Sequence, residues 1–414
     1  MLYSKDKSYK IFNGNCLDVL KKMPDNFVDT IITDPPYGLS FMGKKWDYDV
    51  PSVEIWQECL RVLKHGGTAL IFAGSRTQHR MAVNVEDAGF ILKDCIMWLY
   101  GSGFPKATDI SKQLDKGHER KVIGENPNYH SEGKRSGTGL NHYNENTKSF
   151  SNPDSAKNIT EPATPEAKLW NGWKSHGLKP AYEPIIVAVK PNDGTYANNA
   201  LKHGVSGLNI DGSRIEVSEE DKYDLEERKL SSGSNNITNV NFTGRYKDLK
   251  HGVQKQGRFP ANIILDEEAG KILDEQSGIL KSGNIKKGAL TGTDWKSGDI
   301  SHERVGGRLK QSKEYPTNSG GASRFFYCAK ASKKEKNSGC DEISSNTHPT
   351  VKPLKLMEYL STLTKTPTGG IVLDPFAGSG TTGVACKNTN RKIIMVEMDE
   401  NYCEIIKNRM ENKN

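Results

Sequence analysis

The sequence predicts an α/β fold, with a largely parallel sheet flanked by helices and interrupted by a long insertion. Three observations predict it. Near both ends of the chain, short apolar runs alternate with helix-like segments, which is typical of βαβ units. Between them, residues 101–180 and 192–346 show little hydrophobic periodicity and are rich in Gly, Asn, Ser and Lys. The chain has 414 residues, enough for two ordinary domains or one large domain with an insertion.

The first hundred residues supply the first half of the sheet. Val28–Thr33 is rich in β-branched residues and stops at two prolines. Val53–Leu63 has apolar residues at helical spacing and precedes Gly66 and Gly67, which indicate a helix end. In chain order we expect a strand at Tyr9–Phe12, a helix at Cys16–Met23, a strand at Val28–Thr33, a helix at Val53–Leu63, a strand at Thr68–Ala73, a helix at Gln78–Asp87 and a strand at Phe90–Tyr100.

The alternation resumes after residue 348. The irregular middle holds one isolated strand, Pro184–Val189, and two short apolar islands, Phe259–Leu265 and Arg324–Ala329. Towards the C-terminus we expect a helix at Leu354–Leu363, a strand at Gly370–Leu373, a helix at Thr381–Asn388, a strand at Lys392–Val396 and a helix at Asn401–Met410.

Composition excludes several classes of protein. Hydrophobic residues make up 35% of the chain and the mean hydropathy is −0.67. The longest apolar stretches are far shorter than the roughly 20 residues that span a bilayer, and the N-terminus has no apolar signal region. The seven cysteines are scattered without a C-x-x-C pair, so we expect reduced thiols and no metal site. These features indicate a soluble cytoplasmic protein.

The charge is unevenly distributed. The formal net charge is +7, which by itself identifies no partner. Residues 241–336, however, contain 19 Lys and Arg against 11 Asp and Glu, and 308–336 alone contain eight against two. Such a basic stretch could follow DNA phosphates, although a solvated surface would be the favoured interpretation if this were the only observation.

A glycine-rich turn near the C-terminus indicates an adenosyl ligand. Residues 369–383 read as a strand, a turn containing Gly378 and Gly380, and a helix whose free N–H groups could meet a ligand. Glu397 follows Gly378 by nineteen residues and ends the next strand, where a carboxylate could bind ribose hydroxyls. The pattern also satisfies the G-x-G-x-x-G dinucleotide fingerprint, so an NAD-dependent oxidoreductase is one alternative.

Two features favour a smaller ligand with an amino-acid tail over NAD. Asp374 lies four residues before Gly378, and a carboxylate there suits an ammonium group better than a pyrophosphate. Only 17 residues follow Glu397, too few for the second half of a dinucleotide-binding fold in its normal order. A P-loop is excluded because Thr381 stands where its lysine would be.

The second motif, Asp34-Pro35-Pro36-Tyr37, comes directly after a strand. Two consecutive prolines remove backbone donors and restrict φ, which stiffens the loop. A stiff loop with a carboxylate on one side and an aromatic ring on the other could hold an exocyclic amine. Asp34 and the Pro35 carbonyl would accept its N–H groups, and Tyr37 would stack on the ring. An ordinary strand-to-loop turn is the simpler interpretation, but the position at a strand's carboxyl end favours a ligand site.

Together the two motifs resemble those of DNA amino-methyltransferases, which transfer a methyl group from S-adenosylmethionine to adenine N6 or cytosine N4. The order, with the catalytic motif first and the cofactor motif last, resembles the β class, a circularly permuted Rossmann-like methyltransferase sheet with a long inserted target-recognition region. Asn13–Leu20 resembles the segment that contacts the cofactor adenine, although the family usually has Asp where this chain has Asn15. His348–Pro353 resembles the motif whose lysine approaches the cofactor carboxylate.

The resemblance implies particular site residues and partners. It covers residues 10–100, 169–190 and 348–409, including segments similar to phage and prophage-type members. Double-stranded DNA with a flipped base is the expected partner, S-adenosyl-L-methionine the cofactor, and both a homodimer and a separate cognate restriction endonuclease are compatible with it. The implied catalytic residues are Asp34, Pro35, Pro36 and Tyr37, and the implied cofactor-binding residues are Asn15, Cys16, Asp34, Lys352, Asp374, Phe376, Ala377, Gly378, Ser379, Gly380, Thr381, Thr382, Glu397 and Met398.

The same resemblance divides the chain by role. Residues 1–100, 169–190 and 347–414 would form the catalytic core, 101–168 an irregular insertion near the active site, and 191–346 the target-recognition region. Asp34 as the first motif residue favours adenine N6, a family tendency that leaves cytosine N4 open. A non-catalytic DNA-binding module is a further alternative, disfavoured because both motifs are intact. RNA or protein amines are less favoured substrates.

Overall fold

The computed structural model describes residues 1–39, 48–103, 107–126, 157–217, 257–281, 290–291, 309–310, 319–329 and 351–411. Most of the basic stretch 308–336 and the first three residues of the His348–Pro353 motif therefore lie outside the described residues. Among the described residues, no helix is both long and apolar enough to span a membrane.

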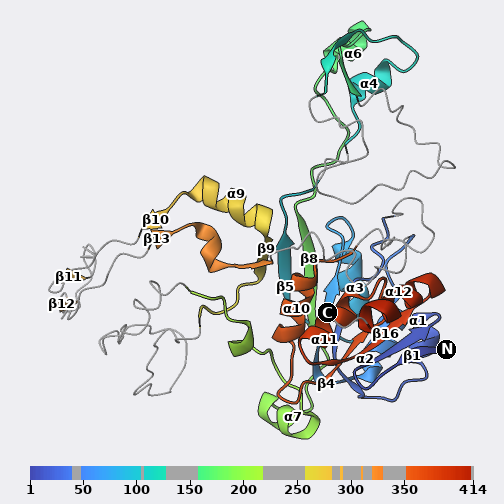
Figure 1. Ribbon diagram of the computed structural model, residues 1–414, viewed down its shortest axis with the longest axis vertical. Coiled ribbons are helices and arrows are strands. Elements are labelled where there is room, and N and C mark those ends of the chain that lie inside the picture. Colours follow the sequence, from blue (N-terminus) through green and yellow to red (C-terminus); the bar gives the residue numbers. More distant parts are fainter. Residues whose placement is uncertain are drawn as a thin grey trace, which may run out of the picture.

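A ten-stranded mixed sheet forms the centre of the molecule (Figure 1). A parallel block lies between an antiparallel N-terminal edge strand and a second group of strands from the middle of the chain. Across the sheet, the order is β1 (Leu2–Lys5), β2 (Tyr9–Asn13), β16 (Lys392–Glu397), β15 (Ile371–Asp374), β3 (Val28–Thr33), β4 (Leu63–Phe72), β8 (Tyr182–Val189), β5 (Ile91–Leu99), β9 (Ile263–Asp266) and β14 (Tyr327–Ala329).

The neighbouring positions of β15 and β3 bring the two distant motifs together. Val372 pairs with Thr30 and Leu373 with Ile31 in a parallel register, so both strands end at the same edge of the sheet. The DPPY motif follows β3, and the glycine turn follows β15. The edge formed by the carboxyl ends of these parallel strands is therefore the place where the two motifs meet.

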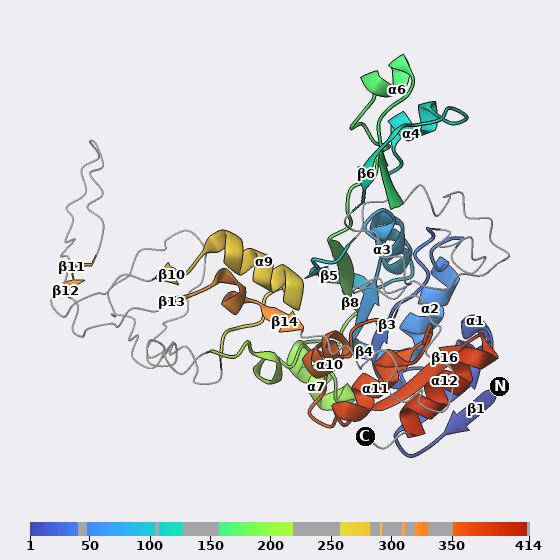
Figure 2. The same cartoon turned by 45° about the horizontal axis from the view of Figure 1, so that its top comes forward.

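Helices from the two halves of the chain cover opposite faces of the sheet (Figures 1 and 2). Successive strand residues point to opposite faces, so Ile31 packs in one core and Ile32 in the other. One face is covered by α1 (Cys16–Leu20), α2 (Val53–Val62) and α3 (Gln78–Asp87), and the other by α10 (Leu354–Leu363), α11 (Thr381–Asn388) and α12 (Glu400–Glu411). The helices expected at Gln78–Asp87, Leu354–Leu363 and Thr381–Asn388 have the observed bounds.

The sheet is largely parallel, as expected, but it differs from the expectation in two details. β8 runs antiparallel to both β4 and β5, because apolar alternation carries no information on strand direction. In addition, Gly66 and Gly67 lie within β4 and do not simply end a helix. Gly66 has φ +72°, and a Cβ there would lie 2.3 Å from the Asn199 amide nitrogen, so glycine allows this close approach.

The middle of the chain contains more regular structure than its periodicity predicts. A small unit, called the arm below, comprises residues 107–126 and 157–178 and projects from the carboxyl end of β5 and the start of β8 (Figures 1 and 2). Asp115 links its two segments by accepting hydrogen bonds from Ala163 and Thr164 amides at 2.9 and 3.0 Å. The elements not anticipated in the described part of this region are α4 (Ile110–Leu114), β6 (Val122–Glu125), β7 (Asn158–Thr160), α6 (Pro165–Leu169), α7 (Tyr196–His203), the 3₁₀ helix η3 (Asp211–Ser213), α9 (Glu267–Ser277), the two-residue strands β10 (Leu280–Lys281), β11 (Leu290–Thr291), β12 (Leu309–Lys310) and β13 (Ser319–Gly320), and the 3₁₀ helix η4 (Ala322–Phe325).

Strands β9 and β14 come from residues 191–346, the region expected to recognise the target. They nevertheless extend the central sheet, because β9 pairs in parallel with β5 and β14 pairs in parallel with β9. Residues expected to form a separate recognition region therefore supply one edge of the central sheet.

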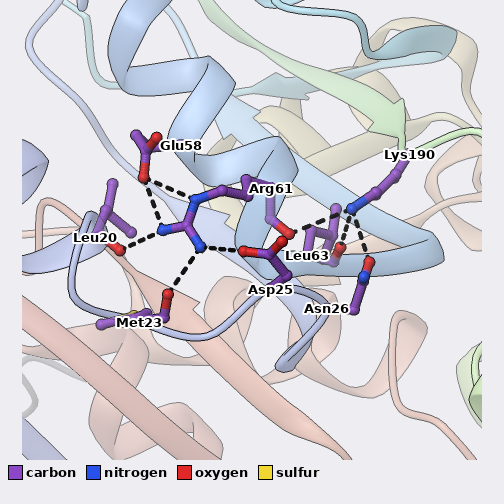
Figure 3. Close-up of polar contacts among 8 residues, drawn as sticks. All are labelled: Leu20, Met23, Asp25, Asn26, Glu58, Arg61, Leu63 and Lys190. Atoms are coloured by element: carbon purple, nitrogen blue, oxygen red, sulfur yellow. Dashed lines mark hydrogen bonds and ion pairs between the residues drawn. The ribbon is translucent and has the colours of Figure 1, made fainter.

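A polar cluster fixes the opposite, amino-terminal edge of β3 and β4 (Figure 3). The Arg61 guanidinium donates to the Leu20 and Met23 carbonyls at 2.7 and 2.8 Å. Lys190 donates to the Asn26 side chain and to the Leu63 carbonyl, each at 2.8 Å. These bonds hold the loop before β3 against α2 and the start of β4. They therefore fix where β3 begins relative to its neighbour in the sheet.

Candidate active site

A large cavity opens at the carboxyl ends of β3, β4, β15 and β16. Its volume is about 1,810 Å³, more than the roughly 300–1,000 Å³ typical of a small-molecule site. Residues of both motifs line it together with Lys174–Glu183, which lead from the arm into β8. The cavity therefore has room for two ligands that meet between the motifs.

The structure brings the sequence-predicted residues together with one exception. The predicted residues that line this one cavity are Asn15, Cys16, Asp34, Pro35, Pro36, Tyr37, Lys352, Asp374, Phe376, Ala377, Gly378, Ser379, Thr381, Thr382, Glu397 and Met398. The exception, Gly380, lies behind the lining. It has φ +78°, and a Cβ on it would lie 2.9 Å from Ile406. Its lack of a side chain allows the start of α11 to pack against α12.

At one end of the cavity, the Asp374 carboxylate is buried beneath the glycine turn. Thr33 Oγ1 donates to its Oδ1 at 2.7 Å, and the Phe376 amide donates to the same oxygen at 3.1 Å. Burial raises the pKa of Asp374 to about 6, although the hydrogen bonds from Thr382, Thr33 and Phe376 oppose the rise. The Thr33–Asp374 bond joins the end of β3 to the end of β15.

The Glu397 carboxylate lies at the end of β16 in the same half of the cavity. It accepts the Gly378 amide at 2.8 Å and the Asp399 amide at 2.9 Å. Burial raises the pKa of Glu397 to about 7, with these backbone bonds opposing the rise. The carboxylate is thus fixed by backbone groups in a partly dehydrated position at a strand end.

The neighbouring β2–α1 turn completes this end. The Asn15 side chain caps α1 by accepting the Leu17 amide at 2.9 Å. Burial raises the pKa of Cys16 to about 11, so its thiol stays protonated at neutral pH. Both residues contribute a neutral surface to the cavity wall.

This end of the cavity suits an adenosyl compound with an amino-acid tail. Glu397 could accept from two ribose hydroxyls, and Asp374 lies where it could face an ammonium group. Phe376, Cys16 and Met398 supply apolar lining between them. Among the described residues, no cluster of His, Cys, Asp and Glu could hold a metal ion.

At the other end, four side chains form a closely connected polar cluster. Lys352 Nζ lies 2.8 Å from Asp34 Oδ2 and 3.0 Å from Glu183 Oε2. The Tyr37 hydroxyl lies 2.6 Å from Asp34 Oδ1 and 3.1 Å from Glu183 Oε2. Lys352 Nζ also lies 3.1 Å from the Tyr37 hydroxyl oxygen. This arrangement, called the tetrad below, puts two carboxylates around one ammonium and one phenol.

The tetrad holds Lys352 and Tyr37 in their protonated forms. Burial alone would lower the pKa of Lys352, but the charges of Asp34 and Glu183 outweigh it and raise the pKa above its usual value. Burial and the same two carboxylates raise the pKa of Tyr37 well above its usual value. Lys352 therefore remains a cation and Tyr37 a hydrogen-bond donor across the physiological pH range.

Sequence reasoning missed Glu183 as a site residue. It enters through β8, which β4 flanks on one side and β5 on the other. The only signal in the sequence was its place directly before the predicted strand Pro184–Val189, within a segment that resembles phage-type family members. Trp98 and Tyr100, at the end of β5, also line the cavity, with ring centroids 5.2 Å apart. Residues 104–106, which follow these two aromatic residues in the chain, lie outside the described residues.

Comparison with protein families identifies one match that spans nearly the whole chain. The model of the family described as DNA methylase, the N6/N4 methyltransferases, matches residues 28–408. The match includes both motifs and all the residues of the tetrad.

Individual relatives are more distant or more local. The type II methyltransferase M.HindIII of Haemophilus influenzae is 23% identical and covers 97% of this chain and 94% of its own length. The type II methyltransferase M2.DpnII of Streptococcus pneumoniae is 43% identical over 67 residues, which are 16% of this chain and 25% of that protein. Among solved structures, the M1.HpyAVI–SAM complex aligns over 97% of this chain and 100% of that chain, with a TM-score of 0.37 and 16% identity. The cytosine-N4-specific PvuII methyltransferase aligns over 99% and 89%, with a TM-score of 0.44 and 14% identity.

Proposed function

Because the chain belongs to the DNA methylase family of S-adenosylmethionine-dependent amino-methyltransferases, we propose that it methylates the exocyclic N6 amine of adenine at a specific sequence in double-stranded DNA. One observation carries the proposal. Asp34, which suits an exocyclic amine, and Glu397, which suits a ribose, line the same cavity from strands brought together by the sheet order. An amine and a methyl donor held in this cavity would face each other across the junction of β3 and β15.

The amine to be methylated is a weak nucleophile, because its lone pair is delocalised into the base. Asp34 and the Pro35 carbonyl would accept its two N–H groups and favour a pyramidal nitrogen whose lone pair points at the methyl group. When bound, S-adenosylmethionine would supply that methyl group from its sulfonium, so that the N–CH₃ bond forms as the S–CH₃ bond breaks and a neutral thioether is left. Asp34 would then accept the surplus amine proton and pass it to water. Positioning and preorganised polarity supply most of the rate enhancement.

The proposed cofactor contacts follow the described geometry. Glu397 would accept the ribose hydroxyls, Asp374 would face the ammonium group, and Asn15 and Cys16 would border the adenine. The resemblance directs Lys352 to the cofactor carboxylate, yet its ammonium is bonded to Asp34 and Glu183. We therefore assign Lys352 to the junction between the two ligand sites.

A base inside a duplex cannot reach this cavity, so the target must be flipped out at a cost of a few kcal/mol. Stacking on an aromatic ring returns about 1–3 kcal/mol per base, and Tyr37 lies in the wall beside Asp34. We propose that residues 191–346 read the flanking sequence and that residues 1–100, 169–190 and 347–414 carry the catalysis. A homodimer and a separate endonuclease stay predictions of the family resemblance.

Product identification tests the proposal. Unmethylated bacterial DNA is incubated with the protein and methyl-labelled S-adenosylmethionine, digested to nucleosides and analysed by mass spectrometry. Label in N6-methyl-2′-deoxyadenosine is the expected result. Label in N4-methyl-2′-deoxycytidine would keep the mechanism and replace the substrate, whereas DNA without label would contradict the proposal.

A further inference from the structure

Both oxygens of the proposed amine acceptor, Asp34, are already bonded to protein donors. Oδ1 accepts from the Tyr37 hydroxyl at 2.6 Å, and Oδ2 pairs with Lys352 at 2.8 Å. Each oxygen can accept a second bond. However, an oxygen already polarised by an ammonium is a poorer acceptor for a neutral amine. Asp34 therefore works best when these donors turn away from it.

Glu183 offers both donors a second acceptor without any movement of the backbone. Its Oε2 lies 3.0 Å from Lys352 Nζ and 3.1 Å from the Tyr37 hydroxyl, within hydrogen-bond range of each. Tyr37 has a single hydroxyl proton, so it donates fully to Asp34 or to Glu183 but not to both. A rotation of that hydroxyl and a small shift of Lys352 would transfer both bonds to Glu183.

We propose that Glu183 is a positioning residue that takes over Lys352 and the Tyr37 hydroxyl when the target amine binds Asp34. This inference rests on the proposed function and adds a residue to it. Glu183 keeps the buried ammonium paired throughout, which avoids the cost of an unpaired charge. Without its charge, Lys352 has Asp34 as its one carboxylate in the tetrad and competes directly with the substrate amine.

The test is a set of substitutions measured in single turnovers with saturating labelled S-adenosylmethionine. Glu183→Gln keeps the size of the side chain and removes its charge, so the methyl-transfer rate should fall about 10–100-fold, with the Kd for S-adenosylmethionine within about threefold of wild type. Glu183→Asp, which keeps the charge, should retain an intermediate rate. A second substitution, Lys352→Gln, in the Glu183→Gln background should restore the rate about 3–10-fold, because it removes the competitor for Asp34.

A matched control comes from the opposite edge of the sheet. Glu58 pairs with Arg61 at 2.7 Å, and its side chain is 19% exposed, close to the 22% of Glu183. Glu58→Gln removes a comparable ion pair outside the cavity and should leave the rate per folded molecule unchanged.

Three results would overturn the inference: a wild-type rate in Glu183→Gln, an equal loss in Glu58→Gln, or a double variant no faster than Glu183→Gln. Failure of the proposed function looks different, because the wild-type protein itself would then transfer no methyl group to DNA. Unfolding is monitored by thermal denaturation, and all rates are compared per folded molecule.

Discussion

Lys190 and Lys352 lie at opposite edges of one sheet and are equally buried, with 9% of each residue exposed. Lys190 closes the amino-terminal edge by donating to the Leu63 carbonyl and the Asn26 amide oxygen. Lys352 lies at the carboxyl edge between Asp34 and Glu183. The first lysine thus meets neutral oxygens held by the fold, and the second meets two carboxylates that face a cavity.

This difference shifts the pKa values of the two lysines in opposite directions. Burial lowers the pKa of Lys190, and the charge of Arg61 lowers it further, while the charge of Asp25 opposes the fall without cancelling it. Burial also acts on Lys352, but two negative charges raise its pKa. At the amino-terminal edge, the polar groups bond to backbone and side-chain oxygens that the fold holds in place, so they contribute to stability. At the carboxyl edge, the polar groups of the tetrad face the cavity, where a ligand can replace one of their hydrogen-bond partners.

Removing Asp34 should have the largest effect on activity. Asp34→Ala deletes the amine acceptor, and loss of such a preorganised group typically lowers the rate by about 10²–10³-fold. Lys352 keeps Glu183 as a partner, and the Glu397 end is untouched, so calorimetry should give a Kd for S-adenosylmethionine within about threefold of wild type. A normal turnover rate in Asp34→Ala would contradict a functional role for the polar groups at the carboxyl edge.

Substitution of Gly380 tests whether this motif residue serves packing, unlike the motif residues that line the cavity. In Gly380→Ala, the left-handed φ and the 2.9 Å approach to Ile406 should together lower the free energy of unfolding by about 2–4 kcal/mol. Gly204→Ala is the matched control: its φ is +71°, with no atom within 4 Å of the new Cβ, so it should cost only about 1 kcal/mol. Urea unfolding measures both, and equal losses would contradict a packing role for Gly380.

The affinity for S-adenosylmethionine should depend on pH through Glu397. With its pKa raised to about 7, Glu397 is largely ionised at pH 8 and largely protonated at pH 6. Protonation removes acceptor capacity, so binding should weaken about tenfold from pH 8 to pH 6. Asp374, with a pKa of about 6, should add a further loss of about twofold at pH 6.

Calorimetry over this range provides the measurement, and Glu397→Gln provides its control. The variant should bind more weakly at pH 8 and show a flatter profile, since only Asp374 and the ligand itself still titrate. A profile as steep as that of wild type would show that another group carries the dependence.

Lys190→Met should have the smallest effect. The substitution leaves the Asn26 and Leu63 oxygens without one of their donors, which should lower the free energy of unfolding by about 1 kcal/mol. The methyl-transfer rate per folded molecule should match that of wild type. A large loss of rate with normal stability would mean that the amino-terminal edge takes part in function.

The sequence predicts long elements better than short ones, because a longer element shows more of its hydrophobic pattern. Gln78–Asp87, Leu354–Leu363 and Thr381–Asn388 are predicted with their observed bounds, because each has eight to ten residues, enough for two or more helical turns. β9 and β14 have only four and three residues, too few for a period to be read. Strand direction in β8 depends on tertiary pairing, which a single apolar run does not encode.

The candidate site divides in the same way. Asp34, Asp374 and Glu397 belong to compact motifs, so their residue types and their spacing along the chain are enough to indicate chemistry. Glu183 belongs to no such motif, and its importance arises only when β8 inserts between β4 and β5. Gly380 fits the motif by spacing, yet the packing of α11 against α12 determines its role.

The adenine assignment and the role of Asp34 can be tested together by expression in a host that lacks DNA methylation, followed by sequencing that detects modified bases in context. We expect N6-methyladenine at one recurring sequence in cells that express the wild-type protein, and none in cells that express Asp34→Ala. N4-methylcytosine at the recurring sequence would contradict the adenine assignment. Unmodified DNA with the wild-type protein, or equal modification with Asp34→Ala, would contradict the account of the site.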